Sequence, residues 1–166
     1  MVPEIRKILY ATDLSRNARY AFGYAASLAN RYGAGITVLT VLKDTYSSHD
    51  MSVMDLIREE NILTIGEADK QEIMRLVEAR LKQFCQGGKK ELSSCPFLVD
   101  EIIVEIGEPV SAILAWVQKA GCDIVVMGAH GRGMIVNALI GSVSRRVVRR
   151  CRKPVLVVRL PEDAQT

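Results

Sequence analysis

The sequence predicts an α/β fold: a single doubly wound, Rossmann-like domain with a five-stranded, mostly parallel sheet and helices on both faces. Five short apolar or β-branched runs alternate along the chain with segments whose apolar residues recur at helical spacing. Strands that are joined through helices pair in parallel by right-handed crossovers. No repeat, low-complexity tract or linker divides the 166 residues, so we expect one domain over residues 1–166.

The first two predicted strands flank a helix. Residues 7–12 form a short β-prone run, which is followed at once by the N-cap chemistry of an Asp-Leu-Ser sequence. Apolar residues then recur at helical spacing over residues 18–32, and we expect Gly33 and Gly35 to close this helix. Residues 36–42 are nearly all apolar or β-branched, as in a strand that is covered on both faces.

The middle of the chain is less regular. Residues 43–66 are polar and Ser-rich at first and then gain scattered apolar side chains, which predicts a connection with a helical turn or two. From Glu67 onward, an apolar stripe predicts a helix that ends at Gly87 and Gly88. Residues 97–106 alternate loosely between apolar and polar side chains, so we expect the third strand there.

The last part of the chain adds two strands and two helices. Pro109 is at a tolerated first-turn position and predicts the start of a helix that Gly121 ends. Residues 123–128 form a buried type of strand, and a Gly-rich segment follows them. Residues 154–159 form the last predicted strand. The helix before it is marked by apolar residues at helical spacing: Val143, Val147, Val148 and Cys151.

The composition is that of an ordinary globular protein, with 49% hydrophobic and 25% charged residues. It excludes a disordered, collagen-like or coiled-coil chain, and no apolar run approaches the ~20 residues that a membrane-spanning helix needs. Residues 1–7 carry charges where a signal peptide would be apolar, so we expect a cytoplasmic protein with no membrane partner. The four cysteines form no Cys-x-x-Cys pair, and we expect reduced, mostly buried thiols.

Charge is distributed unevenly along the chain. Residues 1–123 hold 14 basic and 17 acidic residues, whereas residues 124–166 hold 8 basic and 2 acidic ones, so a net charge of −3 is followed by one of +6. Six of the nine residues from Arg145 to Lys153 are basic, and valines at helical spacing put them on an outer helix face. We expect this face to be solvated, with a protein interface as the alternative. A nucleic-acid partner is not expected, because the face lacks aromatic residues for base stacking.

Ligands of doubly wound sheets bind beyond the carboxyl ends of the strands, where the strand order reverses. The richest of these positions is the segment after the fourth predicted strand. Its first glycine ends a buried strand, where a ligand or another backbone can approach closely. The next two glycines allow positive φ and an anion-binding nest of N–H groups, and the last one opens a helix whose N-terminus favours phosphate. The glycines and side-chain donors of this segment are Gly128, Gly131, Arg132, Gly133, Gly141, Ser142 and Ser144.

This segment also has a plainer interpretation, in which the glycines only shape a long loop and Ser142 is an ordinary N-cap. Its position after a parallel strand and its acid-free surroundings favour phosphate binding. His130 is expected to be a loop residue rather than a catalytic base, because the sequence offers no nearby acid to orient it.

The spacing Gly128-x2-Gly131-x9-Gly141-Ser142 resembles the Gly-x2-Gly-x9-Gly-Ser/Thr nucleotide-binding motif of the universal stress protein family. Three further segments resemble strands and loops of that family: residues 8–15, 123–128 and 154–158. The likeness runs through nearly the whole chain and is weakest over residues 43–66. It implies the ATP-binding branch of the family, with ATP, ADP or AMP as the ligand and Mg²⁺ as its metal.

The resemblance also implies roles for single residues. In nucleotide-binding members, the acid that matches Asp13 contacts the ribose or a metal near the phosphates, and the residue that matches Val41 presents backbone groups to adenine. The glycines of the motif and the residues just after it hold the phosphates. A capping role is the alternative for Asp13. The candidate binding set is Ala11, Thr12, Asp13, Val41, Met127, Gly128, Gly131, Arg132, Gly133, Gly141, Ser142, Val143 and Ser144.

Other nucleotide-binding folds lack their motifs in this sequence. There is no Gly-x4-Gly-Lys-Ser/Thr loop, no Gly-x-Gly-x-x-Gly after the first strand and no His-x-Gly-His element. No base or water-positioning residue for ATP hydrolysis is evident either. We therefore expect a nucleotide-linked stress or signalling module that binds ATP without efficient turnover. The alternatives are a slow metal-dependent ATPase or phosphotransferase that works through Asp13, and an interaction protein that has lost nucleotide binding.

The last predicted strand suggests how the chain assembles. Residues 155–158 are apolar on both faces and would be exposed at the edge of a sheet. Pairing with a second copy across a two-fold axis removes such an edge, and the family resemblance implies dimers of this kind. We expect a homodimer through the last strand.

Overall fold

Five strands and four helices follow one another in the part of the chain that the computed structural model describes, residues 1–42, 70–91, 97–131 and 140–161. Their order and bounds are β1 (Lys7–Ala11), α1 (Arg16–Tyr32), β2 (Gly35–Leu42), α3 (Lys70–Glu91), β3 (Leu98–Ile106), α4 (Pro109–Lys119), β4 (Ile124–Gly128), α5 (Ser142–Arg150) and β5 (Val155–Val158). The predicted connection over residues 43–66 lies outside the described residues.

The sheet is parallel throughout, in the order β3-β2-β1-β4-β5. The chain adds β2 and β3 on one side of β1 and then returns to add β4 and β5 on the other side. The order therefore reverses between β1 and β4, whose last paired residues are Ala11 and Met127. This arrangement confirms the predicted doubly wound α/β fold, and it puts the loops after β1 and β4 at the switch point where such folds bind ligands.

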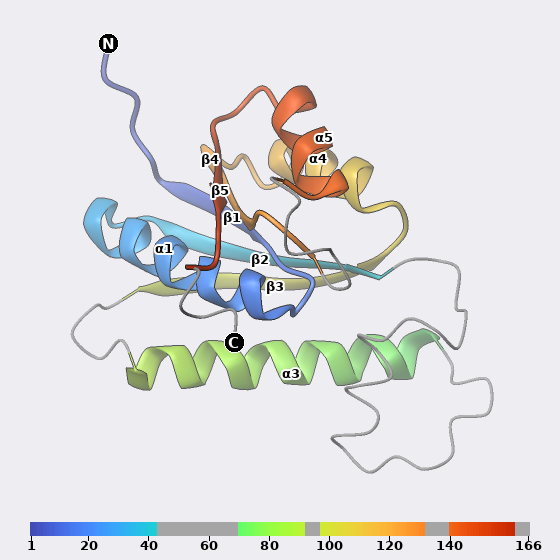
Figure 1. Ribbon diagram of the computed structural model, residues 1–166. Helices are drawn as coiled ribbons and strands as arrows, with labels where there is room; N and C mark the ends of the chain where they lie inside the picture. Colours follow the sequence, from blue (N-terminus) through green and yellow to red (C-terminus); the bar gives the residue numbers. More distant parts are fainter. Residues whose placement is uncertain (43–69, 92–96, 132–139, 162–166) are drawn as a thin grey trace.

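Two helices cover each face of the sheet: α1 and α3 lie on one side, and α4 and α5 on the other (Figure 1). Successive residues of β1 point to opposite faces, so that Ile8 and Tyr10 pack with α1 and α3, whereas Leu9 and Ala11 pack with α4 and α5. The Tyr10 hydroxyl donates a hydrogen bond of 2.6 Å to the Ala18 carbonyl, and its burial raises the pKa of this phenol. Both faces of the central strands are thus buried, as their apolar sequences predict.

The ends of two helices have the predicted chemistry. Ser15 is the N-cap of α1, and its hydroxyl accepts a hydrogen bond of 3.2 Å from the Ala18 N–H. Gly33 ends α1 in the left-handed conformation with φ 64°. Glu108 caps α4 in front of Pro109, and Ser111 N–H and hydroxyl donors lower the pKa of the Glu108 carboxyl. These ends depend on neighbouring residues, which is why sequence reasoning located them.

Three details differ from the predictions. Gly35 does not close α1 but begins β2, where the Asp100 carboxylate fills the space of a side chain. α3 does not end at Gly87 and Gly88 but continues to Glu91, because its buried stripe outweighs the poor helix propensity of two glycines. Val148 does not share the buried face of α5, since 45% of it is exposed whereas Val147 is fully buried.

The remaining sequence expectations concern cysteines and surfaces. Cys85 and Cys122 are buried free thiols, Cys151 is a half-buried one, and burial raises the pKa of Cys122 to about 11. Cys95 lies outside the described residues. No helix among the described residues is long and apolar enough to cross a membrane.

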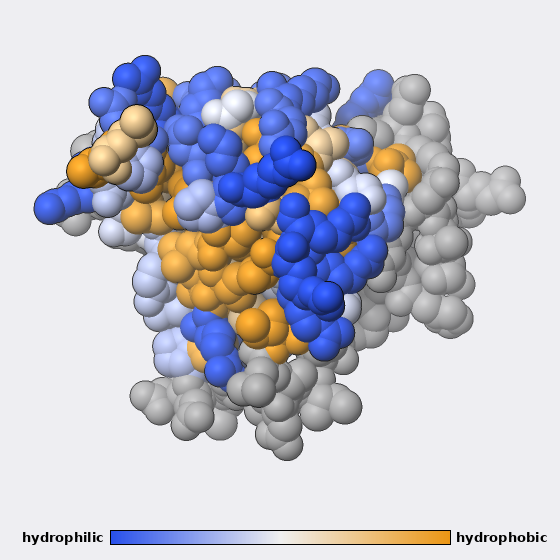
Figure 2. Space-filling model, turned by 90° about the horizontal axis from the view of Figure 1, so that it is seen from above, coloured by the Kyte–Doolittle hydropathy of each residue, from blue (hydrophilic) through white to orange (hydrophobic). Residues whose placement is uncertain are grey.

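Figure 2 shows the side that carries α4 and α5, where hydrophilic side chains flank an apolar area. The six basic residues from Arg145 to Lys153 are exposed, as predicted.

Candidate functional site

The loop after β1 is held by hydrogen bonds of its own residues. The Thr12 hydroxyl accepts from the Leu14 N–H at 3.1 Å, and the Asp13 Oδ1 atom accepts from the Ser15 N–H at 3.0 Å. Leu14 has φ 62°, a left-handed conformation that is uncommon for leucine, and these two short-range bonds support it. Thr12 is buried, whereas Asp13 is exposed at the carboxyl end of β1. The loop therefore presents one carboxylate at the switch point.

The end of β2 presents main-chain groups beside this carboxylate. The Thr12 N–H donates to the Leu39 carbonyl at 2.9 Å, and the pairing of β1 with β2 ends at this point. On the other side of β2, the Leu42 carbonyl accepts from the Gly107 N–H at 2.8 Å. Because backbone groups alternate along a strand, those of Val41 point to the same side as those of Leu39, beyond the end of β1. Val41 can offer a main-chain donor and an acceptor there.

The loop after β4 meets the loop after β1 at Gly131. A Cβ atom on Gly131 would lie 2.7 Å from the Asp13 Oδ2 atom, so the carboxylate rests against the main chain of this glycine. Gly131 is exposed and does not have a positive φ. The predicted left-handed nest is therefore not formed at Gly131, and its missing side chain serves the close approach to Asp13. Arg132 and Gly133 lie outside the described residues.

The start of α5 closes the site from the other side. Gly141, not Ser142, is the N-cap, and no side chain makes a capping hydrogen bond. The alternative in which Ser142 is an ordinary N-cap is thus wrong, since Ser142 is the first helical residue and is exposed. The Gly141 N–H donates to the Ala129 carbonyl at 2.6 Å, which binds the helix start to the loop after β4. The first N–H groups of α5 have no partner within the helix, and they favour an anion.

Gly128 makes room for α1. A Cβ atom there would lie 3.0 Å from the Asn17 Nδ2 atom and 3.1 Å from the Ala18 N atom, so the close neighbour is the backbone of α1. The Asn17 amide continues past it and donates a hydrogen bond of 3.1 Å to the His130 carbonyl. Asn17 was not predicted as a site residue, because its sequence position shows only an ordinary first-turn residue. It lies close to the switch point only through the packing of α1 on β4.

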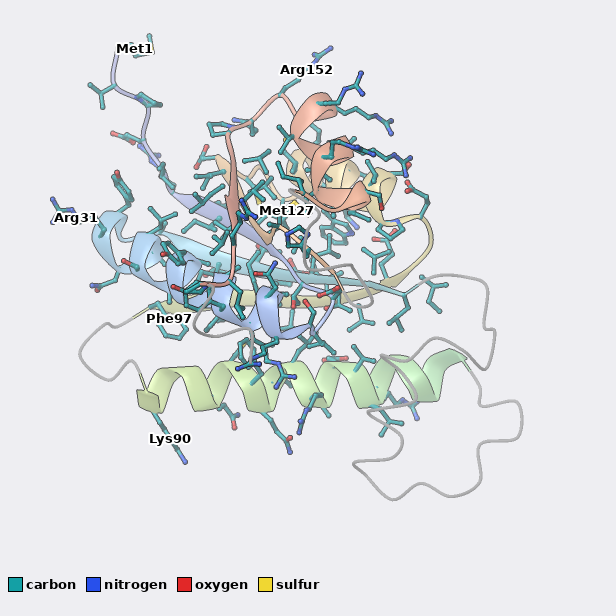
Figure 3. All side chains as sticks on the ribbon, in the orientation of Figure 1. Met1, Arg31, Lys90, Phe97, Met127 and Arg152 are labelled. Atoms are coloured by element: carbon teal, nitrogen blue, oxygen red, sulfur yellow. The ribbon has the colours of Figure 1, made fainter. Side chains whose placement is uncertain are left out.

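Other predicted site residues have their side chains inside the protein. Ala11 and Met127 are buried in the core on the side of α4 and α5, and Figure 3 shows Met127 in the interior. The Ser144 side chain is buried, and its hydroxyl donates to the carbonyls of Gly128 and Ala129 at 3.0 and 3.1 Å. Val143 is half-buried beside the same core. The side chains of these four residues are buried or half-buried, whereas the exposed groups at the switch point belong to Asp13, Gly131 and Ser142.

The side chains at the switch point do not form a complete metal site. Among the described residues, no three His, Cys, Asp or Glu side chains gather around one point. His130 is half-buried, and its Nδ1 atom is buried without a hydrogen-bond partner in the described part of the chain. The His130 carbonyl accepts a hydrogen bond from Asn17, and the absence of a catalytic role for its side chain stays a prediction. The arrangement as a whole can bind an anion next to one carboxylate.

The chain is similar to proteins of one family. The profile of the Universal stress protein family matches residues 4–159. Universal stress protein MJ0577 of Methanocaldococcus jannaschii is 29% identical over 154 residues, which make up 93% of this chain and 94% of that protein. A solved structure described as hypothetical protein MJ0577 superposes with a TM-score of 0.70 at 27% identity, and the match covers 96% of this chain and 99% of that chain.

Two more distant structures share the fold. One is a universal stress protein in complex with cAMP, with a TM-score of 0.58 and 20% identity over 95% of this chain and 98% of that one. The other is a universal stress protein family protein of Arabidopsis thaliana with AMP bound, with a TM-score of 0.57 and 16% identity over 97% of this chain and 95% of that one.

Proposed function

This chain belongs to the universal stress protein family, and from that premise we propose that it binds an adenine nucleotide at the carboxyl ends of β1 and β4. The observation that supports this most is the convergence of Asp13, Gly131 and the uncapped start of α5 at the switch point. A phosphate there meets main-chain N–H groups and the positive end of a helix dipole. The adenine meets the backbone of Val41.

The nucleotide that we propose is ATP. ADP and AMP are related ligands with fewer phosphate groups and less negative charge. Two proteins of this fold are described with cAMP and with AMP bound, so the fold accommodates adenine nucleotides in those proteins. For this chain the proposal depends on its own residues. Gly128, Gly131 and Gly141 admit close main-chain packing, and the stretch between Asp123 and Glu162 contains no acid that would repel a phosphate.

Mg²⁺ completes the proposed ligand. Asp13 is the exposed carboxylate at the switch point, and Mg²⁺ is commonly held by one or two carboxylates together with nucleotide phosphates and water. A single carboxylate therefore fits a cation that arrives with ATP. The residues of the chain hold the nucleotide and orient its phosphates, and none of the described side chains is placed as a base. Our proposal is therefore binding without efficient turnover, in a stress or signalling module of the cytoplasm.

Titration calorimetry with ATP, ADP and AMP, each with and without Mg²⁺, tests the proposal. We expect measurable heat with ATP and a tighter complex in the presence of Mg²⁺. Absorbance and mass spectrometry of the purified protein would detect a nucleotide that is retained through purification. The absence of heat at millimolar concentrations of all three nucleotides would refute the proposal.

An enzymatic function is the second candidate, because Asp13 is exposed at the switch point and would hold a metal that a slow ATPase needs. Single-turnover measurement of phosphate release separates the two. A clear metal-dependent rate that disappears in Asp13→Asn would favour the enzyme. The absence of such a rate in a protein that binds ATP would favour the binding module.

We also propose that the protein is a homodimer through β5. This strand lies at one end of the order β3-β2-β1-β4-β5, and Val155, Leu156 and Val157 are half-buried there. An apolar edge strand is stabilised by pairing with a second copy. Sedimentation should give about twice the mass of one 18.4 kDa chain. A monomer at micromolar concentration would contradict this part of the proposal.

A further inference from the structure

One side chain of α1 reaches the loop that follows β4, 113 residues further along the chain. The Asn17 Nδ2 atom donates a hydrogen bond of 3.1 Å to the His130 carbonyl oxygen. The direction of this amide is fixed, because the opposite orientation would bring the Oδ1 atom against the carbonyl oxygen. In the present orientation Oδ1 is buried and has no hydrogen-bond partner among the described residues. The contact with His130 is thus kept although it leaves a buried acceptor unpaired.

We propose that Asn17 is a positioning residue of the nucleotide site, which sets the direction of the Gly131 N–H toward a bound phosphate. The proposal rests on the proposed function. Asn17 is not assigned a contact with the nucleotide. It acts through the peptide group that joins His130 to Gly131.

The peptide group between His130 and Gly131 is planar, so the directions of its carbonyl and of its N–H are coupled. In a trans peptide the carbonyl of one residue and the N–H of the next point in opposite directions. When Asn17 holds the His130 carbonyl toward α1, the Gly131 N–H points away from α1. The Gly131 N atom also lies beside the helix start, since a Cβ atom on Gly141 would be 3.8 Å from it. The N–H is therefore aligned next to the uncapped first turn of α5.

Asn17 completes a series of contacts on this loop. The Gly128 carbonyl accepts from the Ser144 hydroxyl at 3.0 Å, and the Ala129 carbonyl accepts from the Gly141 N–H at 2.6 Å. The His130 carbonyl is the third in succession, and α1 supplies its donor. Two of these three donors come from the segment that begins α5, and the third, Asn17, comes from α1 on the other face of the sheet. Removal of Asn17 leaves the third peptide group free to turn.

The effect of this freedom should depend on the phosphate. A turned peptide group removes one N–H donor from the phosphate but leaves the contacts of adenine with β2 unchanged. We expect Asn17→Ala to weaken ATP binding about tenfold, the size typical for one hydrogen bond to a charged group. Adenosine binding should change less than about twofold. A general loosening of the fold would weaken both ligands.

The experiment compares four proteins by calorimetry with ATP and with adenosine: wild type, Asn17→Ala, Asn17→Leu and Asn30→Ala. Asn17→Leu lacks the donor but fills a similar volume, so it replaces Asn17→Ala if the smaller side chain impairs folding. Asn30→Ala changes the same residue type at an exposed position of α1 and is the matched control. Hydrogen exchange of residues 129–131 without ligand is measured in parallel.

The expected result is a selective loss of ATP affinity in both Asn17 variants, faster exchange of residues 129–131, and wild-type behaviour of Asn30→Ala. Unchanged ATP affinity, an equal loss for adenosine, or unchanged exchange of residues 129–131 would overturn the proposal. If the wild type binds no nucleotide, the proposed function fails. In that case the exchange measurement still decides whether Asn17 holds the loop.

Discussion

The loops after β1 and β4 meet at the same edge of the sheet but are held in different ways. Within the first loop, the side chains of Thr12, Asp13 and Ser15 each accept a hydrogen bond from a main-chain N–H two or three residues further on. Within the described part of the second loop, Gly128 and Gly131 carry no side chain, and the contacts come from α1, α5 and Asp13.

The loops after β1 and β4 therefore depend on the sequence in two different ways. The first loop is specified by its own residues, so a substitution there removes one contact and leaves the others in place. The second loop is specified by what packs against it, so a substitution there changes the fit between several elements. Four substitutions test these expectations, and they follow in order of decreasing expected effect.

Gly131→Val should have the largest effect. The added side chain would push against the Asp13 carboxylate, which is exposed and can move, so the fold should survive while the phosphate position is blocked. We expect ATP affinity to fall about a hundredfold or more, with an unfolding midpoint within a few degrees of the wild type. Gly23→Val is the matched control, because a Cβ atom at Gly23 would meet no atom within 4 Å. Unchanged calorimetric affinity would show that this loop is not the phosphate site.

Gly128→Ala should affect stability more than Gly131→Val does. Its methyl group would meet the main chain of α1, 3.1 Å from the Ala18 N atom and 3.2 Å from the Asn17 C atom. The backbone of a helix cannot move away as an exposed side chain can. We expect the free energy of unfolding to fall by about 1–3 kcal/mol in urea titrations, as for other overpacked sites. A stability equal to that of the wild type would mean that α1 and β4 are less closely packed than the structure indicates.

Ser15→Ala tests the self-supported loop. Loss of the N-cap should lower the free energy of unfolding by about 1 kcal/mol. ATP affinity should stay within about threefold of the wild type, because Asp13 keeps its position relative to Gly131. Ser15→Thr retains a capping hydroxyl and should recover most of the stability. A large loss of affinity in Ser15→Ala would show that the first loop is as dependent on its surroundings as the second.

Acid titration at the opposite end of the sheet should have the smallest effect. Main-chain N–H groups of Arg6 and Lys7 hold the pKa of the Asp123 carboxyl below its usual value. The stability that this carboxylate contributes is therefore present above about pH 4, the ordinary pKa of an aspartate, and is lost as the pH falls through the lower folded value.

Asp123→Asn is the comparison for this titration. Urea unfolding of the variant should depend less on pH below about 4 than unfolding of the wild type does. Its ATP affinity at pH 7 should equal that of the wild type. Parallel pH profiles for the two proteins would contradict the assigned role of Asp123.

Sequence reasoning located those features that neighbouring residues determine. The Ser15 cap, the left-handed Gly33 and the Pro109 helix start are local patterns, and the alternation of strands and helices led to the correct class of sheet. The predictions that were wrong have the same cause, which is that tertiary packing outweighs the local sequence pattern. The buried stripe of α3 outweighs Gly87 and Gly88, and the Asp100 side chain explains Gly35.

The candidate site shows the same difference between features that the local sequence determines and features that tertiary packing determines. Asp13, Gly131 and Gly141 converge as the strand-end rule predicts. The sequence left open whether the missing side chain of Gly128 makes room for a ligand or for another backbone. The structure favours the backbone of α1. Asn17 could not be found, because its role depends on the distance between two elements that are far apart in sequence.

The glycine at the start of α5 has a consequence for motion. A helix that begins without a side-chain cap frays readily, and an anion that binds its first N–H groups takes the place of the missing cap. Nucleotide occupancy and the order of the first turn should then rise together. The four exposed arginines of α5 are carried by that same short helix. If a nucleotide binds at this helix start, its occupancy should therefore also affect the order of the helix that carries these arginines.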